Sequence, residues 1–408
     1  MAENPAPQLS NSPSLTNKSS LRELAASFLR LGTTAFGGPA GHVAMMEDEF
    51  VRRRNWLSRE KFLELLGASN LIPGPSSSEL AIHIGYLRGG CQGLLVAGVC
   101  FILPAACMVC VLAWAYVHFG KLPGVSRILY GIKPVVIAVI LQALWGLGRT
   151  AIKTKFLAAV GLFSVGLSLF GLQPILLLVI AGASMALADL VTRATKHDRN
   201  AAIAPLTVLR PVGHSTPSLA TAAAGAAAAL APFSLGSLFL VFLKIGAVVF
   251  GSGYVLLAFL RADLVVQRGW LTDSQLVDAI AIGQVTPGPV FTTATFIGYL
   301  LHGASGAAVA TVAIFLPAFL LVAASGPLIP RIRKSRIAGA FLDGVTVASL
   351  ALMAVVAWQL ARASITDPVT AILAAASLFL LLRFRTNSAW LVLLGVLAGL
   401  LVHNMHPH

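Results

Sequence analysis

Two cations, Arg30 and Lys244, lie inside apolar stretches, each shortly before a glycine-rich segment. Arg30 belongs to FLRLGTTAFGG and Lys244 to FLKIGAVVFGS, so both hold the same place in two similar sequences. Ionisable residues in apolar segments are costly and are candidates for function. A matched pair of cations would suit a ligand with two negative charges. The alternative is that each side chain extends from a helix end to the membrane surface.

A Pro-Gly-Pro tripeptide follows in both regions, at residues 73–75 and 287–289. Proline removes an amide donor and glycine permits a sharp turn, so each tripeptide predicts a break between two half-helices. The free N–H groups and the positive dipole end of the second half-helix would then form an anion site. Proline and glycine can also simply kink packed membrane helices. Two breaks at equivalent places, each preceded by an amide and followed by hydroxyl residues, favour a binding site.

The residues expected to bind substrate surround these breaks and the glycine-rich segments. They are Arg30, Lys244, Gly37, Gly38, Gly251, Gly253, Asn70, Gly74, Ser76, Ser77, Gln284, Gly288, Thr292 and Thr293.

Glu79 and His83 lie one helical turn apart after the first break, and the second region has no acidic or basic equivalent. A buried carboxylate near a histidine can titrate in the working range of a transporter, so this pair is expected to couple transport to protons. A satisfied hydrogen bond inside the membrane is the alternative.

The amino-acid composition indicates the class of protein in which these residues are placed. The chain has 408 residues, of which 57% are hydrophobic and 11% charged, with a mean hydropathy of +0.85. Soluble domains carry about 25% charged residues, and lipid tolerates only structures that satisfy their own backbone groups. The sequence therefore predicts an all-α polytopic membrane protein with broken or re-entrant helices. The net charge of +14 comes largely from short loops, so nucleic acid is not an expected partner.

The chain contains two homologous copies of one helical unit. At one constant offset FLRLGTTAFGG matches FLKIGAVVFGS and NWLS matches GWLT, and further matches extend through both regions. Equivalent loops carry opposite charge bias, as in the basic VRRRNWLSREK against VVQRGWLTDSQ, which predicts an inverted topology. Inverted repeats are typical of transporters with a site near the middle of the membrane. The expected divisions are a disordered polar tail (1–20), a first repeat (21–191), a cytoplasmic basic linker (192–218), a second repeat (219–403) and a C-terminal tail (404–408).

The motifs FGGPAGH, NWLS and PGPSSSE, followed by FGSGY, GWLTD, GQVTPGP and TATFIGYL, resemble those of the chromate transporter family. The resemblance covers nearly the whole chain outside the tail and linker, and it is closest to long, two-domain members. It implies a multi-pass protein of the bacterial inner membrane that exports chromate, driven by the proton motive force, and confers chromate resistance. Sulfate is the structural analogue of chromate.

Other classes have less support. The sequence lacks HExxH, GxSxG and the phosphate-binding GxxxxGK[ST] run, so neither an intramembrane enzyme nor an ATP-driven pump is favoured. A membrane scaffold would not need matched helix breaks. We expect a non-enzyme without cofactor or metal, whose partners are chromate and the lipid bilayer, with a homodimer as an option. A carrier of sulfate or another oxyanion stays open, because both ions are tetrahedral dianions of similar size.

Overall fold

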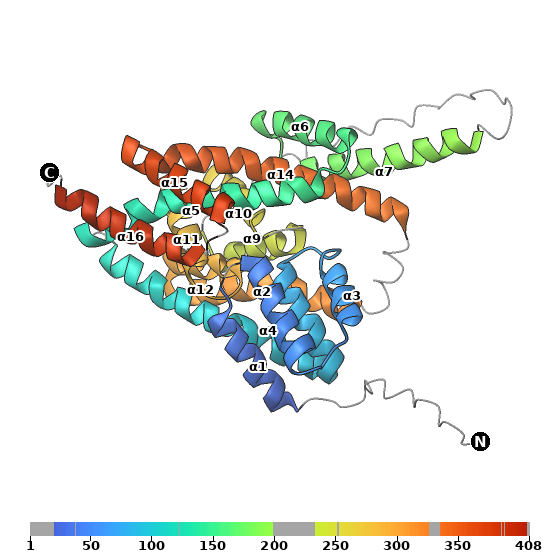
Figure 1. Cartoon of the computed structure of the whole chain (residues 1–408), viewed down its shortest axis with the longest axis horizontal. Helices are drawn as coiled ribbons and strands as arrows, with labels where there is room; N and C mark the ends of the chain where they lie inside the picture. The colour runs from blue at the N-terminus through green and yellow to red at the C-terminus, as the bar shows by residue number, and fades with distance from the viewer. Residues whose placement is uncertain are drawn as a thin grey trace, which may run out of the picture.

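The computed structural model describes residues 20–198 and 233–405, apart from residues 37, 121, 251–252, 326–334, 385 and 387. Every regular element in this part of the chain is helical (Figure 1). The first copy comprises α1 (Leu21–Thr34), α2 (Gly38–Glu47), the π-helix η1 (Asp48–Arg53), α3 (Arg59–Ser69), α4 (Ser76–Phe119), α5 (Pro123–Ala151), α6 (Lys155–Leu169) and α7 (Pro174–Asp198).

The second copy repeats this order. It comprises α9 (Leu235–Val248), α10 (Leu256–Leu260), the π-helix η2 (Arg261–Gln267), α11 (Asp273–Val285), the 3-10 turn η3 (Val290–Thr292), α12 (Thr293–Ser325), α14 (Arg336–Ser364), α15 (Pro368–Phe384) and α16 (Ser388–Met405). Serine or threonine caps the same helices in both copies, with Ser20 and Ser234 at the first helix and Ser58 and Thr272 at the third. The two copies predicted from the sequence are therefore folded alike.

Five helices in the described residues are long and apolar enough to cross a membrane. Their spanning parts are Ser76–Phe119, Arg127–Ala151, Pro174–Thr192, Val290–Ala324 and Arg336–Ser364, and four shorter apolar helices accompany them. The prediction of a polytopic helical membrane protein is confirmed.

The longest helix of each copy is a tight hairpin. In α4 the helical conformation is interrupted at Gly89 and Gly90, and in α12 it is interrupted at His302 and Gly303. Gly90 and Gly303 both have a φ of 59°, which favours glycine. Beside the turn, Gly85 packs directly on the backbone of Gly93, so a side chain at Gly85 would separate the two arms. The first arm therefore runs alongside the second.

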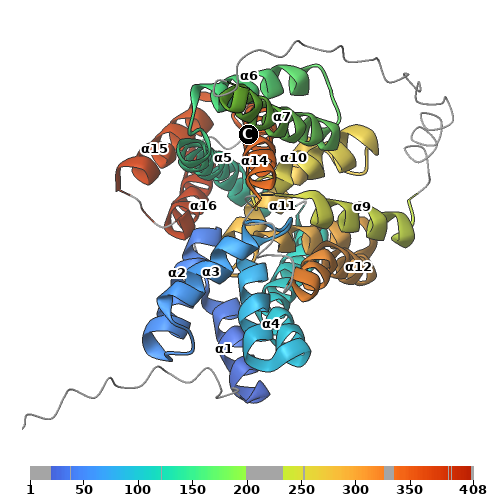
Figure 2. The same ribbon diagram turned by 90° about the vertical axis from the view of Figure 1, so that its right-hand side faces the viewer.

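The last three helices of each copy pack on the other copy. Helix α5 lies against α15 and α16, while α14 lies against α6 and α7. Close glycine contacts hold both pairings, because Gly131 packs on the backbone of Gly395, and Gly344 packs on the backbone of Ala181. Figure 2 shows α5 and α14 near the centre, with α6 and α7 above them and α15 and α16 to the left. The two copies are interlocked rather than placed side by side.

Two helices extend past the expected domain boundaries. Helix α7 continues to Asp198, beyond residue 192 where the linker was expected to begin, and α16 continues to Met405, beyond residue 403. The polar tail up to residue 19, the linker from residue 199, the stretch 219–232 and residues 406–408 lie outside the described residues.

Candidate functional site

The two helix breaks meet the other copy through a pair of reciprocal hydrogen bonds. The amide N–H of Gly74 donates to the carbonyl oxygen of Val249 at 2.7 Å, and that of Gly288 donates to the carbonyl oxygen of Ala35 at 2.9 Å. Ala35 and Val249 end the first helix of their copies at equivalent positions. We call these four residues the crossed junction. It brings both Pro-Gly-Pro breaks and the ends of both first helices to one place.

Both glycines of the crossed junction are required by conformation and by space. Gly74 has a φ of 140° and Gly288 a φ of 100°, values that residues with side chains rarely adopt. A Cβ at Gly288 would collide with Ala105 of α4, and one at Gly74 would collide with the carboxyl group of Glu79. Each break therefore allows the long hairpin of the other copy or the following half-helix to approach its backbone.

His42 connects the crossed junction to the start of α4. Its Nε2 lies 3.1 Å from the carbonyl oxygen of Ala35, and its Nδ1 lies 3.2 Å from the Ser77 hydroxyl. A carbonyl oxygen only accepts, so Nε2–H of His42 donates to Ala35, and when the ring is neutral its Nδ1 accepts from the Ser77 hydroxyl. His42 is 1% exposed. Its ring therefore fixes Ser77, one of the predicted binding residues, relative to the break.

Tyr254 of the second copy lies close to predicted binding residues of both copies. Its hydroxyl donates to Gln284 Oε1 at 3.5 Å, and a Cβ at Gly38 would lie 3.3 Å from the same hydroxyl oxygen. The side-chain amide nitrogen of Gln284 is buried and has no hydrogen-bond partner among the residues that the structure describes. The predicted residues Gly38, Gly74, Ser77, Gln284 and Gly288 thus gather around the crossed junction.

Glu79 and His83 lie in the first arm of α4, directly after the first break. Glu79 is 0% exposed and His83 is 6% exposed. Within the described part of the chain, neither carboxyl oxygen of Glu79 nor Nε2 of His83 has a hydrogen-bond partner. A buried carboxyl group without a partner is costly when ionised. Proton coupling by Glu79 and His83 stays a prediction, and within the described residues Glu79 makes no side-chain hydrogen bond.

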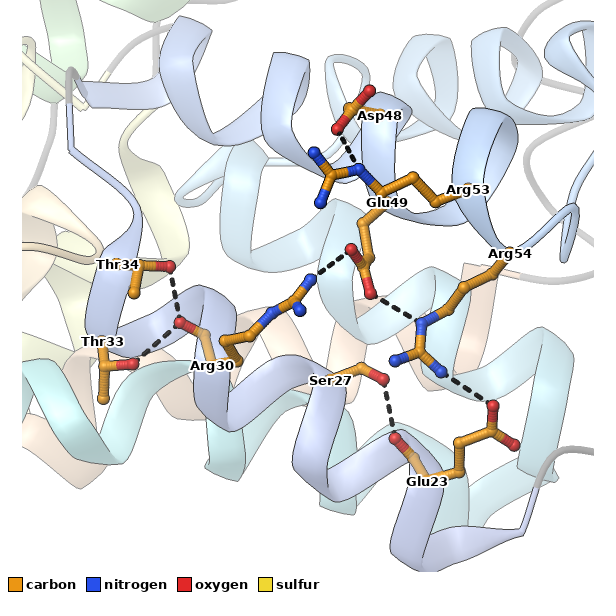
Figure 3. A network of polar contacts seen from close by, with 9 residues as sticks. All are labelled: Glu23, Ser27, Arg30, Thr33, Thr34, Asp48, Glu49, Arg53 and Arg54. Carbon is orange, nitrogen blue, oxygen red and sulfur yellow. Dashed lines mark hydrogen bonds and ion pairs between the residues drawn. The ribbon is translucent and has the colours of Figure 1, made fainter.

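Arg30 and Lys244 each pair with a carboxylate on the π-helix of their own copy. Arg30 contacts Glu49 and Lys244 contacts Asp263, and the two carboxylates are themselves at equivalent positions. Glu49 also accepts from Arg54 at 2.6 Å, and Arg54 reaches Glu23 at 2.7 Å, forming the network in Figure 3. The side chains of Arg30 and Lys244 are 53% and 39% exposed, whereas both acids are 5% exposed. Binding of a dianion by these cations stays a prediction, and in this structure each has an acidic partner.

The remaining predicted binding residues are distributed around this centre. Thr292 and Thr293 donate their hydroxyl hydrogens to the carbonyl oxygens of Pro289 and Val290, both at 2.8 Å. Gly253 is buried near Phe291, and Ser76 begins α4. Asn70 is exposed at the end of α3 and lines a cavity. Gly37 and Gly251 lie outside the described residues.

One buried ionic cluster was not predicted from the sequence. Lys133 of α5 lies 3.0 Å from the carboxylate of Asp278 on α11, and the hydroxyl of Tyr116 donates to the same carboxylate at 2.9 Å. The side chains of Lys133 and Asp278 are 20% and 5% exposed. Both are ionisable residues in apolar surroundings, which is the available sequence signal. Their pairing joins different copies, so spacing along the chain does not reveal it.

Binding of an anion at the start of α4 stays a prediction. Pro75, which precedes this helix, provides no side-chain cap, so the first-turn amides lack the cap that Ser20 and Ser58 give to other helices. Such amides and the helix dipole attract negative charge. The carboxyl group of Glu79 lies in the same turn, so its charge opposes an anion there unless it is protonated.

Similarity to known sequences shows the family to which this chain belongs. The sequence profile described as "Chromate transporter" matches residues 22–187 and 236–400, one match for each copy. A "Chromate transport protein" from Cupriavidus metallidurans is 36% identical over 95% of this chain and 94% of its own length. One of the same name from Pseudomonas aeruginosa is 30% identical over 93% of this chain and 92% of its own. The "Uncharacterized transporter YwrA" of Bacillus subtilis is 29% identical over 36% of this chain and 83% of its own length. No solved structure matches. This chain therefore belongs to the chromate transporter family, with two copies of the family's unit.

Proposed function

We propose that the protein is a secondary active transporter that exports chromate across the bacterial inner membrane and so confers chromate resistance. The observation that carries this proposal is the crossed junction, which brings two helix breaks together at the interface of two interlocked copies. Broken helices at such an interface are where secondary transporters bind their substrates. The names of the relatives, chromate transport proteins, give the substrate.

The electrical charge of chromate favours export. Moving one elementary charge across the membrane changes the free energy by about 2.3 kcal/mol per 100 mV. When a dianion leaves a cell with a negative interior, its free energy therefore falls by roughly twice that amount. When one proton leaves with the dianion, the net charge is halved and the free energy falls by roughly half as much. The membrane potential can thus drive export without ATP.

Glu79 and His83 are the proposed proton-coupling residues. Glu79 shares the start of α4 with the proposed anion site and has no hydrogen-bond partner within the described residues. An arriving dianion would favour proton uptake by this carboxyl group, because a neutral acid removes the repulsion. His83, one turn further along the helix, would exchange the proton with Glu79.

Flux of radiolabelled chromate into everted vesicles tests the proposed function. We expect uptake that depends on the imposed potential, that sulfate inhibits and that an uncoupler reduces. In Glu79→Gln we expect flux that no longer responds to a pH gradient, since an amide cannot release a proton. Potential-driven uptake of sulfate without uptake of chromate would instead favour the sulfate carrier. Absence of both would contradict oxyanion transport.

The two copies are proposed to have opposite orientations in the membrane, on the basis of their opposite loop charges. Single cysteines at Asn55 and Gly269 test this, because these residues hold equivalent positive-φ turns, with φ of 51° and 61°. A membrane-impermeant thiol reagent should label the two from opposite sides in a background without the four native cysteines. Labelling of both from one side would contradict the inversion.

A further inference from the structure

A cavity of about 300 Å³ with a mixed polar and apolar lining opens between the two copies, and Phe250, next to Val249 of the crossed junction, lines it. Its walls include the end of α5 with the residue Lys153 that follows it, and the first half of α14. The polar lining residues from these segments are Thr150, Lys153, Asp343, Thr346 and Ser349. Asn70, the last residue before the turn into the first break, also lines the cavity. The cavity therefore adjoins the proposed anion site.

The hydrogen-bond donors at the mouth of the cavity differ from those in its interior. Lys153 and Asp343 form an ion pair of 2.9 Å with side chains 61% and 41% exposed, so they mark the open end. Ser349 is 1% exposed, and its hydroxyl has no hydrogen-bond partner in the portion of the chain that the structure describes. A buried hydroxyl without a partner is unfavourable, and a ligand that accepts its hydrogen removes the penalty.

The threonines of the cavity already use their hydrogens. Thr150 donates to the carbonyl oxygen of Leu147 at 2.9 Å, and Thr346 donates to that of Leu342 at 2.7 Å. The donors left for a ligand are the ammonium group of Lys153, the hydroxyl of Ser349 and the amide of Asn70. An ammonium, a hydroxyl and an amide are suitable donors for an oxyanion.

The equivalent positions at the other end of α5 and α14 carry different side chains. There, Ser349 is replaced by Val136 and Leu147 by Leu360, both 0% exposed. Lys133 takes the place of Thr346 and pairs with Asp278. The two equivalent interfaces therefore differ in their donors, because the buried hydroxyl of Ser349 is replaced by the apolar side chain of Val136.

We infer that this cavity is the access path of the oxyanion from one side of the membrane, with Lys153 as the first ligand and Ser349 and Asn70 as the inner ligands. The inference rests on the proposed function. Entry of the anion breaks the pair between Lys153 and Asp343, and the freed ammonium accompanies the anion toward Ser349.

Substitutions of the two charged residues at the cavity mouth test whether Lys153 is the first ligand of the anion. Lys153→Gln should raise the chromate concentration for half-maximal flux about tenfold, the effect of losing one charged contact. Asp343→Asn should leave that concentration unchanged or lower it, because it frees the lysine. Lys155→Gln, an exposed cation just outside the cavity, is the matched control. If both Lys153→Gln and Asp343→Asn weaken flux equally, the pair is only structural and the inference is wrong.

Thiol labelling tests the path itself. Ser349→Cys and Val136→Cys are made in a background without native cysteines and treated with an anionic methanethiosulfonate in vesicles of known orientation. Cys at 349 should react from one side only and be protected by sulfate but not by chloride at equal ionic strength. Cys at 136 should react much more slowly. Equal reactivity, or no protection in a variant that still transports chromate, would overturn the path. Absence of chromate flux in the native protein would instead contradict the proposed function.

Discussion

The two copies share their framework and differ in their ionisable residues. Both have the π-helix with its cation–carboxylate pair, the glycine at the break and the left-handed glycine in the hairpin. The acid and histidine after the first break, Glu79 and His83, are replaced by Thr292 and Phe296 in the second copy. The features of the framework are thus duplicated, whereas the residues proposed for proton coupling are present once.

The buried cluster of Lys133, Asp278 and Tyr116 follows the same rule. Glu64 takes the place of Asp278 in the first copy, but it is 49% exposed and pairs with Lys61 on its own helix. Asp278 of the second copy instead pairs with Lys133 of the first copy. The cluster therefore joins α5 to α11, the helix that leads into the second break.

The largest effect is expected from the shared glycines of the crossed junction. Gly74→Leu and Gly288→Leu should each abolish chromate flux in protein that still inserts, because the side chain occupies the space of Glu79 or Ala105 and requires an unfavourable φ. Gly146→Leu is the control, since no atom lies within 4 Å of its Cβ position. Normal flux in both junction variants would mean that the breaks are only packing kinks.

The next largest effect concerns stability at the buried cluster. Lys133→Met leaves Asp278 buried without its cation and should lower the free energy of unfolding by about 3–5 kcal/mol. Thermal unfolding in detergent measures this, and Lys133→Met combined with Asp278→Leu should recover much of the loss. Lys61→Met, at the exposed counterpart pair, should cost less than about 1 kcal/mol. Equal losses at the two pairs would remove the distinction between the copies.

A smaller effect is expected at the matched cations. Arg30→Gln and Lys244→Gln should each weaken chromate binding by about 1–3 kcal/mol, or about tenfold to a hundredfold in half-saturation. Arg30→Lys should be milder, since it keeps the charge. Glu49→Gln and Asp263→Asn distinguish anion binding by the two cations from a purely structural role of the two ion pairs. They should preserve affinity if the cations bind the anion, whereas all four variants should weaken folding alike if the pairs only hold the π-helices.

The smallest effect is expected at the hairpin turns. Gly90→Ala and Gly303→Ala meet no atom within 4 Å, so only the backbone conformation opposes them, with a φ of 59° and ψ of −146° and −150°. Each should lower the free energy of unfolding by about 1–2 kcal/mol, within the cost of a conformation that essentially only glycine adopts, measured by thermal unfolding. The two losses should be similar, because the turns are equivalent. A large difference would show that one hairpin has a further role.

Much of the framework could be predicted from the sequence. The constant offset between the copies locates their helices, since α1 and α9, or α5 and α14, have bounds that match residue by residue. Proline and glycine at residues 73–75 and 287–289 locate the breaks. These features are local or repeated, so one chain contains the information.

The contacts between the copies could not be predicted in this way. Hydrophobic segments do not show which helix they pack against, so the exchange of α5 and α14 between the copies is not visible in the sequence. The ion pairs of Arg30 and Lys244 are easier to predict from the sequence. Each has an acid at the same spacing, Glu49 and Asp263, and this coincidence of four charges indicates a pair within each copy. The cavity at Ser349 depends on side chains from both copies and has no sequence pattern.

The reciprocal hydrogen bonds of the crossed junction also determine the smallest unit that can fold completely. Each break donates its glycine N–H to a carbonyl oxygen of the other copy, and no acceptor for it lies within its own copy among the described residues. A polypeptide with one copy would leave this amide unpaired in an apolar environment. Two separately expressed halves of this chain should therefore be recovered together and should transport only as a pair, while either half alone should be degraded.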